Sequence, residues 1–189
     1  SPMAVQLLVQ HGHTVKIETG CGEKANFSDL DYSSIGGEVI FDTTAIYNCD
    51  VLLKVAPPTE EEIKLMKPDQ ILVSAIQLIR TKEVIIKKLL AKNIVAVGYE
   101  FLRDDEGSLP IIRSMSEIAG RASVLIASEF LSNYNSGKGE LFGGIPGIQP
   151  TQIVVIGAGA VGEYAVRAAI GLGASVKVFD NSIEKLRRL

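Results

Sequence analysis

Short apolar runs recur along the first half of the chain and predict buried β-strands. They are rich in valine and isoleucine and cover residues 15–18, 51–55, 71–75 and 94–97. Helical patterns lie between them, and two of these are expected to begin near Thr59 and Thr81. Three glutamates follow Thr59, where a threonine hydroxyl can cap a helix and the helix dipole favours acidic side chains. Apolar strands that alternate with amphipathic helices predict a parallel sheet covered by helices on both faces.

A long helix and a glycine-rich stretch occupy the middle of the chain. Ser116 is expected to open the helix, which extends over residues 116–133 and contains small residues suited to close packing. Residues 135–150 are rich in glycine and proline, which is the one clear shift of composition along the chain. They are interpreted as a connector between domains.

The composition narrows the classes of function. Hydrophobic residues make up 47% of the 189 residues, which is ample for a packed core. The formal net charge of −3 argues against a nucleic-acid-binding protein, because phosphate contacts need a basic face. The cysteines, Cys21 and Cys49, form neither a disulfide framework nor a zinc site. No apolar run approaches the roughly 18 residues of a membrane span, so a soluble, cytoplasmic protein without a metal ion is expected.

The strongest chemical signal lies between residues 152 and 180. An apolar strand at 153–156 runs directly into Gly157-Ala158-Gly159-Ala160-Val161-Gly162. A helix at 163–172 and a second strand at 175–179 are expected to follow. A glycine triplet between a strand and a helix is typical of the turn that binds the diphosphate of a dinucleotide.

Each part of this turn has a physical reason. Gly157 permits a tight turn, Gly159 lets the backbone approach a pyrophosphate, and Gly162 lets the helix pack closely on the strand. Asp180 ends the second strand, where a carboxylate accepts hydrogen bonds from the adenosine ribose and repels a 2′-phosphate. The turn therefore predicts NAD as the cofactor, in preference to NADP. The predicted cofactor contacts in this segment are Gly157, Ala158, Gly159, Ala160, Val161, Gly162 and Asp180.

Together these features predict an α/β protein with two Rossmann-like parallel-sheet domains. The first is an N-terminal substrate domain at residues 1–134, which includes the long helix. The connector at 135–150 leads to residues 151–189, which form the first half of an NAD-binding Rossmann domain.

Three strings of residues carry a resemblance to a known family. They are Met-Ser-Glu-Ile-Ala-Gly-Arg at 115–121, Gly-Lys-Gly-Glu-Leu-Phe-Gly-Gly-Ile-Pro-Gly at 137–147, and the glycine turn. With them the chain resembles, over its whole length, the family of alanine dehydrogenase and the alpha subunit of nicotinamide-nucleotide transhydrogenase. The first two strings are more similar to alanine dehydrogenase. The resemblance implies a substrate domain that faces an NAD domain, and oxidation of L-alanine to pyruvate by hydride transfer.

The resemblance also implies roles for individual residues. Lys54 matches the lysine that holds the carboxylate or carbonyl of the substrate, and a fixed cation there orients an α-keto acid and polarises its carbonyl. Met115 and Ser116 match positions near the substrate and the nicotinamide. A solvated strand-end lysine and a helix-capping serine are the structural alternatives. A homo-oligomer with an amino-acid or keto-acid substrate is implied as well.

The chain departs from the family at one catalytic position. The dehydrogenases carry a histidine acid/base where this chain has Gln77. Glutamine hydrogen-bonds a carbonyl but does not shuttle a proton near neutral pH. His11 and His13 flank Gly12 at a predicted helix-to-strand turn and are interpreted as structural.

Three functions are therefore weighed. An alanine-dehydrogenase-like oxidoreductase is favoured, although Gln77 counts against it. An NAD(H)-binding subunit of a transhydrogenase needs no histidine, but the Met-Ser-Glu and Gly-Gly-Ile-Pro-Gly strings count against it. The third is a non-catalytic NAD-binding relative. Compared with members of that family, the chain is expected to be incomplete at both ends and inactive on its own.

Overall fold

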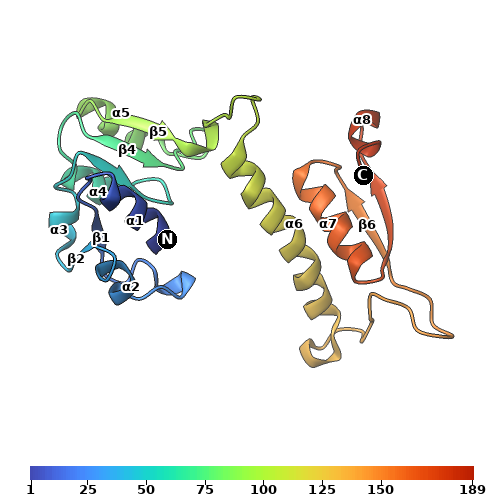
Figure 1. Cartoon of the computed structure of the whole chain (residues 1–189). Coiled ribbons are helices and arrows are strands. Elements are labelled where there is room, and N and C mark those ends of the chain that lie inside the picture. The colour runs from blue at the N-terminus through green and yellow to red at the C-terminus, as the bar shows by residue number, and fades with distance from the viewer. The chain divides into compact units, whose positions relative to one another are not determined.

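The computed structural model describes all 189 residues, and the chain divides into two compact units, residues 1–100 and 101–189 (Figure 1). Every ladder between its strands is parallel. Parallel strands need crossover connections, and helices supply them in both units. The predicted α/β class with parallel sheets is thereby confirmed. None of the helices combines the length and the hydrophobicity that a membrane span requires.

Unit 1 contains two parallel sheets, one with the order β1-β2 and one with the order β3-β4-β5. Its strands are β1 Lys16–Glu18, β2 Glu38–Ile40, β3 Val51–Leu53, β4 Ile71–Ser74 and β5 Val95–Gly98. Its helices are α1 Pro2–Gln10, η1 Glu23–Ala25, α2 Asp29–Ser33, α3 Thr43–Ile46, α4 Glu60–Leu65 and α5 Glu83–Ala91, and η2 Tyr99–Phe101 follows β5. The apolar runs seen in the sequence thus form strands. Three of these are one or two residues shorter than predicted, and the fourth, β5, is shifted by one residue. The strand β2 was not predicted.

The starts of two helices follow different rules. Thr59 caps α4 as predicted, and it forms a reciprocal capping box with Glu62. The helix α5 begins two residues after Thr81, and Lys82 is its N-cap residue. The Thr81 hydroxyl donates instead to the carbonyl of Ile76 at 2.5 Å, so it stabilises the preceding turn. The helix expected to begin near Thr81 is therefore present, and its first residue lies two positions later, at Glu83.

The histidines lie where the sequence placed them, at the turn between α1 and β1. Gly12 has a φ of +85°, which ends the helix in a left-handed conformation that favours glycine. The Nδ1 atom of His11 lies 2.8 Å from the carbonyl oxygen of Leu7 in the last turn of α1. The His11 side chain and the left-handed backbone of Gly12 thus both terminate α1.

The larger sheet of unit 1 is covered on one face. Side chains of α4 and α5 pack on the middle strand and form the main core, which comprises Tyr47, Leu52, Ile63, Met66, Leu72, Ile76, Ile85, Leu89 and Ile94. Side chains on the opposite face of the sheet are exposed or half-buried, and Leu53 is 72% exposed. The prediction of helices on both faces is wrong for this sheet, because α4 and α5 bury only the alternate positions that point toward them.

Unit 2 consists of a long helix packed against a strand–helix–strand unit. Its elements are α6 Pro110–Leu131, η3 Asn133–Asn135, β6 Gln152–Ile156, α7 Ala160–Gly171, β7 Ser175–Phe179 and α8 Ile183–Leu186. The helix α6 begins at Pro110, six residues before Ser116, because proline at the first helical position needs no amide hydrogen and has the helical φ. The prediction that Ser116 opens and caps this helix is wrong.

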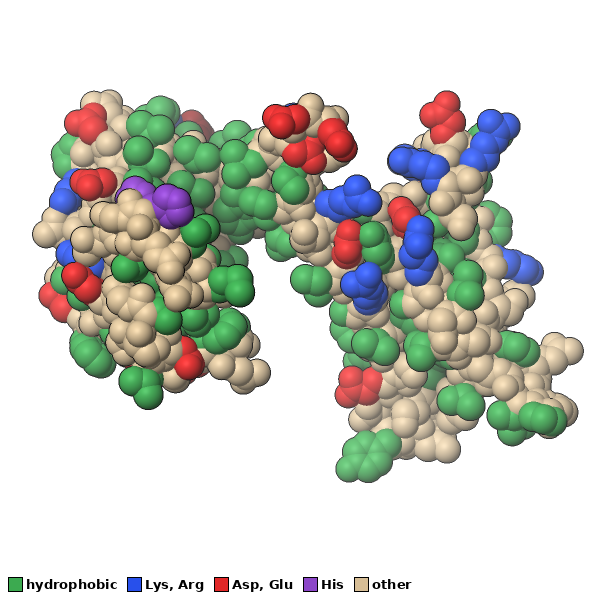
Figure 2. All heavy atoms as spheres, viewed as in Figure 1, with side chains coloured by type: hydrophobic (Ala, Val, Ile, Leu, Met, Phe, Trp, Pro, Cys, Tyr) green, Lys and Arg blue, Asp and Glu red, His purple; other side chains and the backbone are tan.

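The helices α6 and α7 run side by side (Figure 1). A Cβ atom on Gly120 would lie 2.4 Å from the carbonyl oxygen of Val161, so glycine is required for this close approach. Beside it the Tyr164 hydroxyl donates to Glu117 at 2.6 Å, and the Arg121 guanidinium lies 5.0 Å from the centre of the Tyr164 ring. Charged side chains of both signs are visible over these helices (Figure 2).

The glycine- and proline-rich stretch at 135–150 belongs to unit 2. Phe142 lies within it and is buried in the core of that unit together with Val124, Ala165 and Ala169. Along the chain, the boundary between the compact units falls between Glu100 and Phe101, so the long helix belongs to unit 2. The sequence interpretation placed this helix in the first domain. The functional division into domains at 134 and 151 stays a prediction.

Candidate functional site

The turn between β6 and α7 has the geometry that its glycines predict. Gly157 has a φ of +107°, a conformation that side chains other than glycine rarely adopt. A Cβ atom on Gly162 would lie only 1.8 Å from the carbonyl oxygen of Gly157, so the helix packs on the turn without room for a side chain. A Cβ atom on Gly159 would meet nothing within 4 Å, so the space in front of this residue is open. The turn is therefore tightly packed at Gly162 and open to a ligand at Gly159.

The first turn of α7 supplies hydrogen-bond donors for an anion. The helix begins at Ala160, with Gly159 as its N-cap residue and without a side-chain cap. The first amide groups of an α-helix have no acceptor within the helix, and the helix dipole adds positive potential at this end. Helix α7 is 12 residues long, so this potential is fully developed. The open space in front of Gly159 is therefore suited to a phosphate group.

Asp180 is joined directly to this turn. Its Oδ2 atom accepts a hydrogen bond from the Ala158 amide at 2.6 Å, and its Oδ1 atom accepts one from the Ser182 amide at 2.7 Å. The Ala158 bond, followed by the Ser182 bond, lowers the pKa of the Asp180 carboxyl, which is therefore ionised near neutral pH. The Ala158 amide already has an acceptor, so the amides left for a ligand are those at the start of α7.

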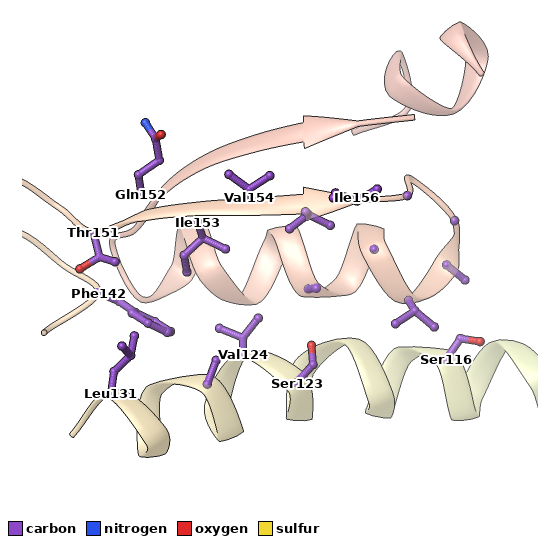
Figure 3. A pocket seen from close by; sticks show the side chains of 18 of the residues that line it. Ser116, Ser123, Val124, Leu131, Phe142, Thr151, Gln152, Ile153, Val154 and Ile156 are labelled. Carbon is purple, nitrogen blue, oxygen red and sulfur yellow. The ribbon is translucent and has the colours of Figure 1, made fainter. Parts of the chain in front are cut away.

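A cavity of about 810 Å³ extends from this turn along β6 (Figure 3). Ser116 lies at the end of the cavity next to the turn, and Phe142 and Thr151 lie at the other end (Figure 3). Most of the wall between them is apolar and is contributed by Val124, Leu131, Ile153, Val155 and Ala165. Of the predicted cofactor contacts, this cavity is lined by Ser116, Gly157, Gly159, Ala160, Val161 and Gly162, but not by Ala158 or Asp180.

The candidate substrate residues of unit 1 follow neighbouring strands of one sheet. Lys54 comes directly after β3, and its amide donates to Val73 of β4 at 3.0 Å. Its ammonium donates to the Glu62 carboxylate at 2.5 Å, and the two side chains are only 20% and 28% exposed. Lys54 is therefore a half-buried, paired cation, and the alternative of a freely solvated lysine does not hold.

Gln77 lies in a strained turn after β4. Its φ is +48°, in the left-handed region that glutamine seldom adopts. The Glu100 carboxylate accepts hydrogen bonds from the amides of Gln77 at 2.6 Å and Ile76 at 3.2 Å, and so it holds the turn in this conformation. The Tyr99 hydroxyl donates to the carbonyl of Val55 at 2.7 Å. Tyr99 and Glu100, which follow β5, thereby hold the segments after β3 and β4 in place by hydrogen bonds. Lys54 and Gln77 lie in these segments.

The predicted site residues fall into two sets. Lys54 and Gln77 belong to unit 1, at the carboxyl ends of strands β3 and β4, where open parallel sheets bind ligands. Met115, which is 54% exposed, belongs to unit 2 with Ser116, the glycine turn and Asp180. In unit 2, Ser116 and the glycine turn line one cavity and Asp180 is bonded to the turn, whereas Lys54 and Gln77 follow neighbouring strands of unit 1.

Sequence reasoning missed the residues that hold the site residues in place. Glu62 could have been found, because a glutamate three residues after a capping threonine forms a capping box. Glu100 and Tyr99 lie more than 20 residues from the backbone groups they bind, and no local pattern indicates such a contact. Tyr164 gave no signal either, although it binds Glu117 of the Met-Ser-Glu string.

The parallel sheets and the strand–glycine turn–helix unit define an α/β protein of the Rossmann type. Residues 1–119 match the family described as the N-terminal domain of alanine dehydrogenase/PNT, and residues 123–189 match its C-terminal domain. The chain therefore belongs to the alanine dehydrogenase/PNT family.

Individual relatives agree with this assignment. The chain is 36% identical to an alanine dehydrogenase of Staphylococcus saprophyticus and 35% identical to alanine dehydrogenase 2 of Staphylococcus aureus, with 100% of the chain aligned to each. It spans about half of these relatives, 51% and 50% of their lengths.

Solved structures give the same result. A structure of L-alanine dehydrogenase matches the whole chain with a TM-score of 0.92 at 38% identity, and the chain covers 52% of it. A transhydrogenase from Sinorhizobium meliloti matches with a TM-score of 0.88 at 22% identity, with 56% of that chain covered. The second likeness concerns the fold alone.

Proposed function

We propose that this chain carries the substrate lysine and the diphosphate-binding turn of an NAD-dependent oxidoreductase of the alanine dehydrogenase type. The observation that carries the proposal is the glycine turn of unit 2. There Gly162 packs tightly against Gly157, the space at Gly159 is open to a ligand, and an ionised Asp180 is bonded to the Ala158 amide. The relatives named alanine dehydrogenase support L-alanine and pyruvate as the substrate pair. The cytoplasm as location, a homo-oligomer and the absence of a metal ion stay predictions.

The position of Asp180 supports NAD rather than NADP. Its carboxylate is fixed at the end of β7 by two amide donors, so it cannot turn away from a ligand that enters the turn. A ribose with free hydroxyl groups can donate to such a carboxylate, whereas a 2′-phosphate would place negative charge beside it.

In this mechanism the residues of unit 1 hold the substrate. NAD, when bound, accepts the hydride that leaves the α-carbon of the amino acid. Lys54 carries a fixed positive charge at a strand end, and it orients the carboxylate or the carbonyl oxygen of the substrate. Gln77 can donate a hydrogen bond from its amide group but cannot take up a proton near neutral pH. The proton transfer that accompanies deamination therefore needs a group other than Gln77.

A second candidate function follows from Gln77 itself. A subunit that passes a hydride between two nucleotides needs no proton shuttle for a substrate amine, so glutamine is acceptable at this position. The likeness to the transhydrogenase shows only that the fold permits this function. The dehydrogenase proposal is favoured because the two relatives named above, at 36% and 35% identity, are alanine dehydrogenases.

Two measurements on the complete protein test the proposal. NADH fluorescence should change saturably when the protein is added, and NADPH should bind at least about tenfold more weakly because of Asp180. L-alanine and NAD should then yield NADH, followed by its absorbance at 340 nm. Binding of NADH without alanine oxidation would favour the transhydrogenase-like alternative, and the absence of any NADH binding would refute both.

A further inference from the structure

A hydrogen bond joins the helices α6 and α7 near the glycine turn. The Tyr164 hydroxyl donates to the Glu117 carboxylate at 2.6 Å, and the Nε atom of Arg113 lies 3.6 Å from the same oxygen atom. The Glu117 side chain is only 28% exposed, so water screens this hydrogen bond incompletely. Hydrogen bonds to an ionised acceptor are roughly twice as strong as those between neutral groups. Tyr164 and Glu117 therefore hold the two helices together at this point.

The half-buried Ser116 comes directly before Glu117. Its side chain lies at the end of the cavity next to the glycine turn (Figure 3). The hydroxyl groups of Ser114 and Ser123 donate to backbone carbonyls of α6 at 3.0 and 2.8 Å, whereas the Ser116 hydroxyl has no partner in the chain. A hydroxyl group supplies one O–H donor and two acceptor lone pairs. That of Ser116 is therefore available to a ligand that occupies the turn.

The backbones of α6 and α7 come close together at Gly120, about one turn after Ser116. A Cβ atom on Gly120 would lie 2.4 Å from the carbonyl oxygen of Val161 and 2.8 Å from the Cβ atom of Tyr164. Glycine has no side chain that could interlock with α7, so this contact sets the distance between the helices rather than their register. The hydrogen bond from Tyr164 to Glu117 acts beside it and resists a shift of α6 along α7.

We propose that Tyr164 is a positioning residue of the cofactor site. Through its hydrogen bond to Glu117 it fixes α6 against α7, and it thereby holds the Ser116 hydroxyl where this group donates to an oxygen atom of the bound dinucleotide. This proposal rests on the proposed binding of the diphosphate at the glycine turn. Tyr164 does not line the cavity, so its hydroxyl acts on the cofactor only through α6.

The expected effect is a moderate loss of cofactor affinity. A group displaced by about 1 Å loses about a hundredfold in function, and the loosening of α6 is a smaller displacement. We therefore expect Tyr164→Phe to weaken NADH binding about five- to tenfold. Ser116→Ala removes the donor itself and should weaken binding at least as much.

The variants remove one hydroxyl group each. Tyr164→Phe retains the aromatic ring, from whose centre the Arg121 guanidinium lies 5.0 Å away. Ser116→Ala places alanine inside α6, where it is the residue most favourable to a helix. Tyr134→Phe is the matched control, because it removes the hydroxyl of a tyrosine of the same unit that is 96% exposed.

Fluorescence titration of the complete protein with NADH provides the readout, and thermal unfolding of each variant accompanies it. In the double variant of Tyr164→Phe and Ser116→Ala, binding should be no weaker than in Ser116→Ala alone, because the Tyr164 hydroxyl then has no donor left to position. Tyr134→Phe should bind NADH like the wild type. A merely structural role of Tyr164 would instead lower the melting temperature and make the two losses of affinity multiply.

The outcomes separate this proposal from the proposed function. Absence of NADH binding by the wild type would refute the cofactor site and this proposal with it. Saturable binding by the wild type together with equal affinity in Tyr164→Phe would refute the role of Tyr164 alone. Multiplied losses in the double variant, undiminished affinity in Ser116→Ala, or an equal loss in Tyr134→Phe would show that Tyr164 does not act through Ser116, and each would overturn the proposal.

Discussion

Two glycines of the turn in unit 2 are expected to respond to alanine in different ways. A Cβ atom on Gly162 would lie 1.8 Å from the carbonyl oxygen of Gly157, against about 3.5 Å for a normal contact, so the turn or the helix must move by more than about 1.5 Å. Overpacking of this kind costs about 1–3 kcal/mol. A domain of about 150–250 residues then melts lower by about 2–4 °C for each kcal/mol.

Gly159→Ala should leave the fold intact. Its φ of −75° and ψ of −175° are open to any residue, and a Cβ atom there would meet nothing within 4 Å. The methyl group would instead occupy the open space in which the diphosphate is proposed to lie. We expect NADH affinity to fall at least tenfold, which is about 1.4 kcal/mol, while the melting temperature stays within about 2 °C of the wild type.

Thermal unfolding and NADH fluorescence titration of the complete protein check both variants together. Gly162→Ala should lose stability and affinity, because a catalytic or binding group displaced by about 1 Å loses about a hundredfold in function. Gly171→Ala near the end of the same helix is the control, since nothing lies within 4 Å of its Cβ position. Wild-type NADH affinity in Gly159→Ala would refute the location of the diphosphate, and wild-type stability in Gly162→Ala would refute the packing argument.

Three further predictions concern other parts of the chain. Gly120→Ala should lower stability by about 1–3 kcal/mol in thermal unfolding, because its Cβ atom would lie 2.4 Å from the Val161 carbonyl oxygen; unchanged unfolding would contradict the close helix contact. The pKa of Asp180 is lowered in the folded state, so its stabilising contribution is complete above about pH 4 and is lost as the pH falls through the folded pKa. Asp180→Asn should therefore be less stable than the wild type at neutral pH, and the difference should disappear in acid; a pH-independent difference would disagree with this linkage. Gln77→His in the complete protein should raise alanine oxidation at 340 nm by tenfold or more, with a pH dependence near the imidazole pKa of about 6.5, and no gain would count against the dehydrogenase function.

Local patterns in the sequence were sufficient for much of the fold. The strands around residues 52, 72 and 154 are short apolar runs, and the glycine turn repeats a motif in which each residue has a steric reason. The helix cap at Thr59 was predicted, because capping depends on residues only a few positions apart, although its reciprocal partner Glu62 was not. Features that depend on neighbours in the sequence were therefore predictable.

Features that depend on tertiary contacts were not. The helix α6 begins at Pro110 rather than at Ser116, because the proline satisfies the helix start and Ser116 then lies on the second turn. The conformation of Gln77 is imposed by Glu100, 23 residues away, and the orientation of Lys54 by Glu62 on the next helix. Residue types and motifs gave the candidate site residues, which stay predictions, but not the side chains that hold them in place.

The central claim, that the turn after β6 binds the diphosphate of NAD(H), is tested most directly by titrating the ¹⁵N-labelled complete protein with NADH. The account predicts saturable shifts of the Gly159, Ala160 and Val161 amide signals, with much smaller shifts at equal concentrations of NADPH. The Gly107 amide, in an exposed loop of the same unit, should not shift and serves as the internal reference. Turn signals that stay in place while NADH binds elsewhere, or does not bind at all, would contradict the claim.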